Sequence, residues 1–263
     1  MSKDRLLAFA NTLGLIIALY LNFLAVSLPL NNKSTGELSD AYPNLFVPAG
    51  FTFSIWGIIY LALIGFVIFQ LKVAFTKSKI PHHFIATIGW WFFISCLANA
   101  SWIVVWHYQY MVLSLVVMLC ILGSLLMIYQ RLNIGMLPIR ASERWFVHTP
   151  FSIYLGWITV ATIANTTTLL VHLGWSGLGI DPQIWTIIVL IVGIAIGSAM
   201  LLRREDIAFG CVIIWAYYGI IAKRTAIDAE AYQAIITTAI VGIVFMAIGI
   251  LNVIRVKMAR AKG

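Results

Sequence analysis

Residues 46–71 read FVPAGFTFSIWGIIYLALIGFVIFQL and include no Asp, Glu, Lys or Arg side chain. As an α-helix with a rise of about 1.5 Å per residue, this stretch is longer than the roughly 30 Å of hydrocarbon in a bilayer. It lacks the charged face that a helix on the surface of a soluble protein carries. The stretch therefore predicts a helix that spans a membrane.

Similar apolar stretches fill the rest of the chain. Apolar residues make up 62% of the sequence, charged residues only 10%, and the mean hydropathy is +0.99. About a quarter of a soluble domain is charged, so this composition excludes a water-soluble globular protein. We predict an all-α fold, a polytopic bundle of about eight transmembrane helices. The predicted spans are residues 6–28, 46–71, 84–106, 110–130, 146–171, 184–202, 207–222 and 232–254.

The seventh predicted span, residues 207–222, is short. Charged residues bracket it closely, with residues 203–206 before it and Lys223 and Arg224 after it. We therefore expect a helix that is little tilted or that lies partly in the membrane interface.

The basic residues indicate the orientation of the bundle. If successive spans alternate in direction, fourteen of the seventeen Lys and Arg residues fall on one side, and Lys33, Lys223 and Arg224 fall on the other. The positive-inside rule then places both termini in the cytoplasm, N-in and C-in, which requires an even number of spans. This topology explains the net charge of +8, so we expect no nucleic-acid partner. We expect a multi-pass protein of the bacterial cytoplasmic membrane, in contact with membrane lipid, and leave homo-oligomerisation open.

The longest predicted external connection, residues 29–46, is polar and rich in turn-forming residues. A connection of this length with little periodicity is often a lid over a binding site. A plain connector fits the same sequence, and both interpretations stay open.

Ionisable groups are absent from the middle of every predicted span. This argues against a proton-driven transporter, although a sodium site built from backbone carbonyls stays open. Cys96, Cys120 and Cys211 lie in apolar runs without the spacing of metal ligands, so we expect neither a metal site nor a disulfide framework. No nucleophile–base pair indicates hydrolytic catalysis.

Three predicted spans carry aromatic and amide side chains at helical spacing, so that each set shares one face. Such a stripe packs helices together, or it lines a mostly apolar cavity with a few polar anchors. Both interpretations are open, but an indole N–H or an Asn amide inside the membrane needs a hydrogen-bond partner. The stripes are Phe53, Trp56 and Tyr60 in the second span, Asn99, Trp102 and Trp106 in the third, and Tyr154, Trp157, Ala161 and Asn165 in the fifth.

At these stripes the chain resembles the translocator-protein, or tryptophan-rich sensory protein (TspO/MBR), family. Residues 47–60 have the proline-bearing entry, aromatic stretch and Trp of the family's second helix. Residues 97–102, LANASW, are similar to the family sequence Leu-Asn-Ala-Ala-Trp-Ser, with the Trp one place late. Residues 153–165, IYLGWITVATIAN, are similar to Pro-Tyr-x-x-Trp-x-x-x-Ala-Thr-x-x-Asn of the fifth helix. The three matches occur in family order within residues 6–172.

The sequence also departs from the family pattern. Ala49 stands where members often have a second proline, and Ile153 replaces the proline of the fifth helix. The first loop has Tyr42-Pro43 in place of the family's Trp-Tyr and Lys-Pro pattern. Because that loop covers the ligand in the family, ligand specificity is the property that these departures affect most.

The resemblance implies a five-helix membrane domain over residues 1–175 and a three-helix extension over residues 176–263. It implies no bound cofactor, but a pocket under the first external loop for an apolar small molecule such as a porphyrin-type tetrapyrrole. The leading hypothesis is a membrane receptor or sensor. A porphyrin-degrading enzyme that uses Trp56 and Trp157 as redox-active groups, and a small-molecule transporter, are the alternatives. The expected ligand-binding residues are Phe53, Trp56, Tyr60, Asn99, Tyr154, Trp157, Ala161 and Asn165.

Overall fold

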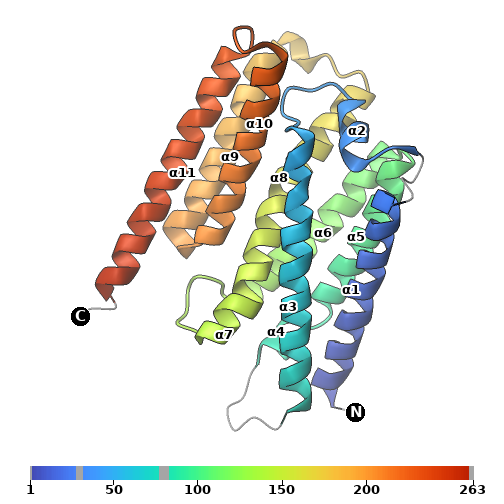
Figure 1. Cartoon of the computed structure of the whole chain (residues 1–263), viewed down its shortest axis with the longest axis vertical. Coiled ribbons are helices and arrows are strands. Elements are labelled where there is room, and N and C mark those ends of the chain that lie inside the picture. Colours follow the sequence, from blue (N-terminus) through green and yellow to red (C-terminus); the bar gives the residue numbers. More distant parts are fainter. Residues whose placement is uncertain (1, 28–31, 77–82, 261–263) are drawn as a thin grey trace.

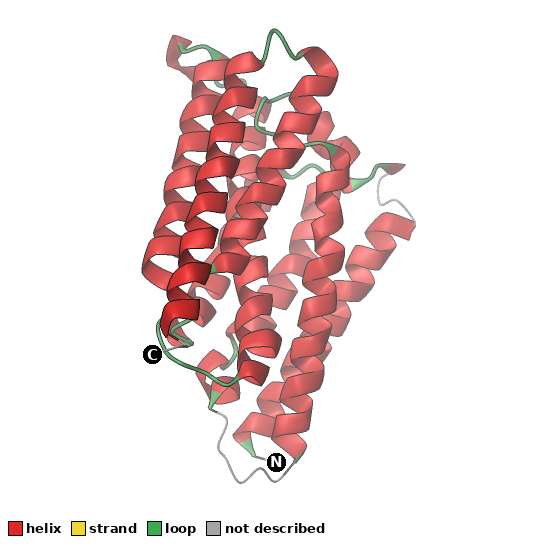
Figure 2. Ribbon diagram, turned by 60° about the vertical axis from the view of Figure 1, so that its left-hand side comes forward, coloured by secondary structure: helices red, strands yellow, loops and turns green. Residues whose placement is uncertain are grey.

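The computed structural model describes residues 2–27, 32–76 and 83–260, which form a bundle of helices without a strand (Figures 1 and 2). The predicted all-α, polytopic fold is therefore confirmed. The residues 29–31 of the predicted external connection, and Lys77, Lys79 and Lys262, lie outside the described residues.

Within these described ranges, seven helical segments are long and apolar enough to cross a membrane. Short helices and turns lie in the connections between them. The elements are α1 (Lys3–Ser27), α2 (Thr35–Asp40), η2 (Gly50–Ser54), α3 (Ile55–Phe75), α4 (Phe84–Ile88), α5 (Trp91–His107), α6 (Met111–Arg131), α7 (Ala141–Glu143), the π-helical η3 (Arg144–His148), α8 (Thr149–His172), η4 (Gly177–Gly179), α9 (Pro182–Arg204), α10 (Ile207–Asp228) and α11 (Gln233–Arg260).

The third predicted span is divided into two helices. Gly89 has a φ of 58°, a left-handed conformation that glycine adopts without strain, and it separates α4 from α5. The apolar helix α5 alone has 17 residues and is shorter than the other spans. It packs against α1 and α6, so the predicted span is occupied by two consecutive segments instead of one continuous helix (Figure 1).

The seventh span is longer than predicted. Helix α10 has 22 residues and includes Lys223 and Arg224, which were expected to follow the span. Both cations have contacts that let the helix continue: Lys223 forms an ion pair with Asp40, and the Arg224 guanidinium lies 5.3 Å from the Tyr232 ring centroid. The prediction of a short seventh helix was therefore wrong.

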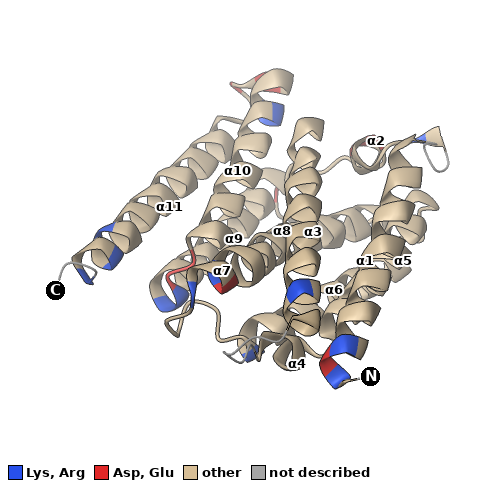
Figure 3. Ribbon diagram, turned by 60° about the horizontal axis from the view of Figure 1, so that its bottom comes forward, with Lys and Arg blue, Asp and Glu red and all other residues tan. Residues whose placement is uncertain are grey.

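Both termini lie at the same end of the bundle (Figure 1). Most of the Lys and Arg residues in the described part of the chain lie toward that end of the ribbon, and few lie at the opposite one (Figure 3). This arrangement agrees with an even number of crossings. The charge distribution assigns the end with the termini to the cytoplasm.

Helices α9, α10 and α11 pack on one another (Figure 1). Helix α10 also packs against α8 and against η2, the short helix that leads into α3. Gly156 of α8 allows close approach, because a Cβ there would lie 3.1 Å from Val212 of α10. The Trp215 indole N–H donates a hydrogen bond to the Thr52 carbonyl at 2.9 Å, and the Ala49 N–H donates to the Gly219 carbonyl at 3.0 Å. Helix α10 thus holds the entry of α3 in place.

Candidate functional site

Trp56 lies at the centre of a group of aromatic rings in the external half of the bundle. Its ring stacks on Tyr60, with a centroid distance of 5.4 Å and an interplanar angle of 22°. It also meets Trp102 at 6.3 Å, Tyr154 at 6.0 Å and Trp157 at 6.3 Å, the last two edge to face. These distances are typical of favourable ring pairs. The tertiary structure therefore brings the stripes of α3, α5 and α8 together.

A small cavity of about 30 Å³ lies beside these rings, and we call it the aromatic cavity. Its space corresponds to about one or two water-sized molecules. Five of the eight expected ligand-binding residues line it. Its walls are Thr35, Ser39, Pro48, Phe53, Trp56, Trp102, Trp106, Trp157, Val160, Ala161, Ala164, Asn165 and Thr168.

The other three expected residues form a hydrogen-bond network next to the cavity. The Asn99 carboxamide oxygen accepts from the Tyr60 hydroxyl at 3.3 Å and from the Asn22 amide at 2.8 Å. The Asn99 amide donates to the Tyr154 hydroxyl at 3.2 Å. Tyr60 and Tyr154 both pack on Trp56, so the network holds in place two of the rings that contact Trp56. Asn22 of α1 was missed, because no motif connects it to the three stripes.

Four buried polar atoms around the aromatic cavity have no hydrogen-bond partner among the described residues. They are the indole nitrogens of Trp102 and Trp157, the carboxamide oxygen of Asn165 and the hydroxyl of Thr168. The Asn165 amide nitrogen, by contrast, donates to the Ser114 hydroxyl at 2.7 Å. An unsatisfied buried polar group costs about 1–3 kcal/mol. The cavity therefore presents two donors, an acceptor and a hydroxyl to anything that enters it.

Helix α2 covers the aromatic cavity. Thr35 and Ser39 line the cavity, and the Thr35 carbonyl accepts a hydrogen bond from the Trp106 indole at 3.4 Å. The helix starts with a capping box, in which the Glu37 N–H donates to the Ser34 hydroxyl and the Ser34 N–H donates to the Glu37 carboxylate at 2.7 Å. The Ser-x-x-Glu spacing is visible in the sequence and is the signal that would have predicted this helix. The external connection was interpreted either as a lid or as a plain connector, and the position of α2 over the cavity favours a lid.

The comparison with family models gives one match, to the model described as TSPO-like protein, over residues 8–252. The chain belongs to this family. No curated protein and no solved structure matches. The match confirms the resemblance drawn from the three stripes. With seven apolar helical segments, it makes the chain a multi-pass integral membrane protein.

The matched region of this TSPO-like chain continues through α9 and α10 and ends near the end of α11. The boundary predicted at residue 175 is thus not a boundary of the match. In the structure, α9–α11 contribute no described residue to the aromatic cavity. The division into a five-helix domain and a three-helix extension remains a prediction.

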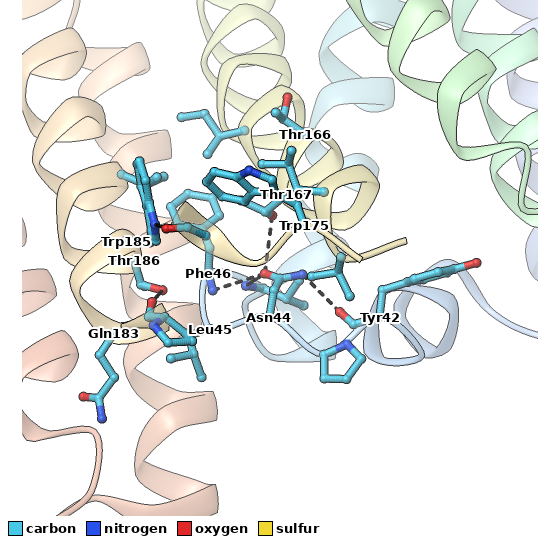
Figure 4. Close-up of a pocket in the computed structure, with 18 of the residues that line it drawn as sticks. Tyr42, Asn44, Leu45, Phe46, Thr166, Thr167, Trp175, Gln183, Trp185 and Thr186 are labelled. Carbon is cyan, nitrogen blue, oxygen red and sulfur yellow. Dashed lines mark hydrogen bonds between the residues drawn. The ribbon is translucent and has the colours of Figure 1, made fainter. Parts of the chain in front are cut away.

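A second and much larger cavity lies between α8, α9, α10 and the first external connection, and we call it the interhelix cleft (Figure 4). Its volume is about 1120 Å³. None of the eight expected residues is among those that line it in the described part of the chain. Sequence patterns did not predict it, because its walls come from segments far apart in the chain. They include Tyr42, Asn44, Phe46, Thr162, Ile163, Thr166, Thr167, Trp175, Trp185, Val189, Val192, Lys223, Arg224 and Tyr232.

The external connection reaches both cavities of the TSPO-like chain. Ser39 lines the aromatic cavity and the cleft, so α2 lies between them. Asn44 holds the connection to α8, because its carboxamide oxygen accepts from the Phe46 and Val47 N–H groups and from the Thr167 hydroxyl (Figure 4). The Tyr42 hydroxyl donates to the Gln109 side chain at 3.0 Å. A movement of this connection would change both cavities.

Within the described ranges, no group of three or more His, Cys, Asp or Glu side chains is placed to hold a metal ion. The chemistry available to the aromatic cavity is therefore that of indoles, amides and hydroxyls. Such groups bind and orient an aromatic or apolar molecule.

Proposed function

We propose that this TSPO-like protein is a membrane receptor or sensor that binds an apolar small molecule of the porphyrin type in the aromatic cavity. Membership of the family supports a binding or sensing role in general. One observation carries the choice of site: four buried polar atoms without partners among the described residues belong to side chains that line a cavity with aromatic and small apolar walls. A flat ligand with polar groups at its edge would satisfy both features.

Binding of a tetrapyrrole requires the cavity to enlarge. Sites for molecules of drug size usually have about 300–1,000 Å³, and the aromatic cavity has about 30 Å³. The cover is the part best suited to move, because α2 is one short helix of six residues. Its hydrogen bond to Trp106 is long, at 3.4 Å. We propose that displacement of α2 opens the site.

One alternative function has an observation in its favour. Trp56, Trp157, Trp102 and Trp106 form a contiguous series of ring contacts with centroid distances of 5.6 to 6.3 Å. Such a series suits a porphyrin-degrading enzyme in which the indoles pass electrons from the bound porphyrin to an external oxidant such as dioxygen. The transporter alternative has no comparable support from the described residues.

The test is a titration of the purified full-length protein in lipid nanodiscs with protoporphyrin in the dark, followed by absorbance. A saturable spectral shift supports the receptor. Trp157→Ala is expected to weaken binding by about 1–3 kcal/mol, as is typical when a central aromatic anchor is removed. Trp145→Ala is the matched control, because Trp145 is 68% exposed and lies outside the cavity.

Three outcomes separate the hypotheses. The absence of a saturable shift in the folded wild-type protein would contradict porphyrin binding. Equal affinity of Trp157→Ala and wild type would move the site away from the aromatic cavity. Bleaching of the bound pigment in light, lost in Trp157→Phe while affinity is retained, would favour the enzyme.

A further inference from the structure

The interhelix cleft contains a buried cation that forms no ion pair among the described residues. Arg224 lines the cleft and is only 4% exposed. Its Nε has no hydrogen-bond partner, and no hydrogen bond or ion pair of its guanidinium is found among the described residues. Its guanidinium lies over the ring of Tyr232, 5.3 Å from the centroid, and it feels the charge of Asp40 without forming an ion pair with it. The nearby carboxylate, Asp40, is instead paired with Lys223.

A buried guanidinium in this state is costly. A charge taken out of water destabilises a protein unless it is paired and hydrogen-bonded, and a cation–π contact compensates only part of that cost. The planar guanidinium is suited to carboxylate and phosphate groups, which accept two parallel hydrogen bonds from it. The geometry therefore favours an oxyanion at Arg224.

Much of the remaining lining of the cleft is apolar, and several of its polar side chains already form hydrogen bonds within the protein. The hydroxyls of Thr162, Thr166 and Thr167 donate to carbonyls of their own helix, at 2.7 to 2.8 Å. The Trp185 indole donates to the Gly177 carbonyl at 2.8 Å, and its ring packs against Trp175 (Figure 4). Among the fully buried side-chain nitrogen and oxygen atoms of the described residues that line the cleft, the one without a hydrogen-bond partner is Arg224 Nε. The acidic side chains on the same walls are Asp40 and Asp181, and Asp181 caps α9 by accepting from the Gln183 N–H.

The shape of the cleft indicates the second part of the ligand. Its wall runs along α9 from Pro182 to Val192, a distance of about 15 Å at the helical rise. Ile163 of α8 and Val189 of α9 belong to its apolar lining. An extended hydrocarbon segment fits this wall, with its polar head at the external end near Arg224.

We propose that the interhelix cleft is a second binding site, specific for an amphipathic anion with a carboxylate or phosphate head on Arg224 and an apolar body between α8 and α9. The ligand is a phospholipid of the bilayer or a free amphiphile of the fatty-acid type, since both present this chemistry. Ser39 lines both this site and the aromatic cavity, but the proposal rests on Arg224 and does not depend on porphyrin binding.

The test uses full-length protein in neutral maltoside micelles. It is titrated with 6-bromododecanoate and with 6-bromododecan-1-ol. Bromine quenches tryptophan at contact, and this position keeps it in the external part of the cleft, where Trp185 lies one turn from Pro182 and packs against Trp175. We expect the carboxylate to quench at a concentration about tenfold lower than the alcohol, as a charge-assisted contact gives. The Trp175→Phe/Trp185→Phe variant defines the part of the quenching that comes from the cleft.

Four variants then test whether Arg224 causes the preference for the carboxylate over the alcohol. Arg224→Gln is expected to make the two probes equal, and Arg224→Lys to keep most of the preference. Arg204→Gln is the matched control, because Arg204 is also a helix-terminal arginine above a tyrosine ring, 5.7 Å from Tyr129, but lies at the opposite end of the bundle. Thr166→Trp keeps Arg224 and fills the cleft, so it is expected to remove quenching by both probes.

Equal quenching by the two probes in the wild type, or a preference that persists in Arg224→Gln, would overturn the proposal. Persistent cleft quenching in folded Thr166→Trp would overturn it as well. Native mass spectrometry of the protein taken from its membrane distinguishes the two sources. A phospholipid adduct that is lost in Arg224→Gln identifies a resident lipid, and a fatty-acid adduct lost in the same variant identifies a free amphiphile.

Discussion

Helix α8 has a different cavity on each of two faces. On one face, Trp157, Ala161 and Asn165 line the aromatic cavity of about 30 Å³. On the other, Thr162 and Thr166 line the interhelix cleft of about 1120 Å³. Among the described residues, the lining of the small cavity includes four neutral polar atoms without hydrogen-bond partners. The lining of the large cavity includes one cation without an ion pair, Arg224. The smaller cavity therefore has more polar groups without partners than the larger one.

This difference separates two kinds of binding site. The aromatic cavity has the chemistry for a specific ligand, but its volume requires α2 to move first. The cleft has the volume already, and one charge decides what it accepts. A receptor that responds by moving its cover corresponds to the first kind, and a preformed site for an amphiphile corresponds to the second.

The largest expected effect comes from ending the chain after Gly179. This removes α9–α11 and with them Arg224, so binding of 6-bromododecanoate at the cleft should be abolished. Every described residue that lines the aromatic cavity is retained, so porphyrin binding should persist. Dark titration of the truncated protein checks this, with circular dichroism to confirm its helix content. A folded truncation without porphyrin binding would show that α10, which holds Thr52 and Ala49, is needed for the site.

Substitutions on the two faces of α8 should have separate effects. Trp157→Ala is expected to weaken porphyrin binding by about 1–3 kcal/mol and to leave 6-bromododecanoate quenching unchanged. Thr166→Trp should do the reverse. Both affinities are measured for both variants. A loss of both in either variant would mean that the two cavities act as one site.

Removal of an unpartnered hydroxyl should stabilise the ligand-free protein. Thr168→Val keeps the shape of the side chain and eliminates a buried oxygen without a partner, so thermal unfolding in detergent should show a gain of about 1 kcal/mol. Thr166→Val is the control on the other face, where the hydroxyl donates to the Thr162 carbonyl and its loss should not stabilise. A destabilised Thr168→Val protein would indicate that this hydroxyl is satisfied.

The smallest expected effect concerns the cover at acidic pH. Hydrogen bonds from the Ser34 backbone and side chain lower the pKa of Glu37 from its ordinary value of 4.5. Because the folded pKa is the lower one, the cap stabilises α2 fully above pH 4.5 and is lost as pH falls through the lowered value. Porphyrin association, measured by stopped flow, should therefore become faster below that range. Glu37→Gln should show little of this change, and an equal change in that variant would exclude Glu37 as its cause.

The aromatic cavity was largely predictable, and the cleft was not. Helical spacing placed Trp56 and Trp157 on single faces of their helices, and the family resemblance paired those faces. Trp102, which belongs to the predicted stripe of α5, and Thr168 of α8 also line this cavity, although neither was among the expected ligand-binding residues. Each lies one turn from an expected residue on its helix. Residue spacing within a helix predicts such neighbours, whereas Asn22 reaches the site from a helix that carries no comparable stripe.

By itself, the sequence determined that the chain spans a membrane as a helical bundle, because uncharged stretches of this length are stable only in hydrocarbon. It also determined which faces of three helices carry indoles and amides. Only the tertiary structure decided that α10 continues through Lys223 and Arg224, that α2 covers the aromatic cavity, and that a cleft opens between α8 and α9. These features depend on contacts between segments far apart in the chain, such as the pair of Lys223 with Asp40. Hydropathy and helical periodicity describe only what is local to each segment.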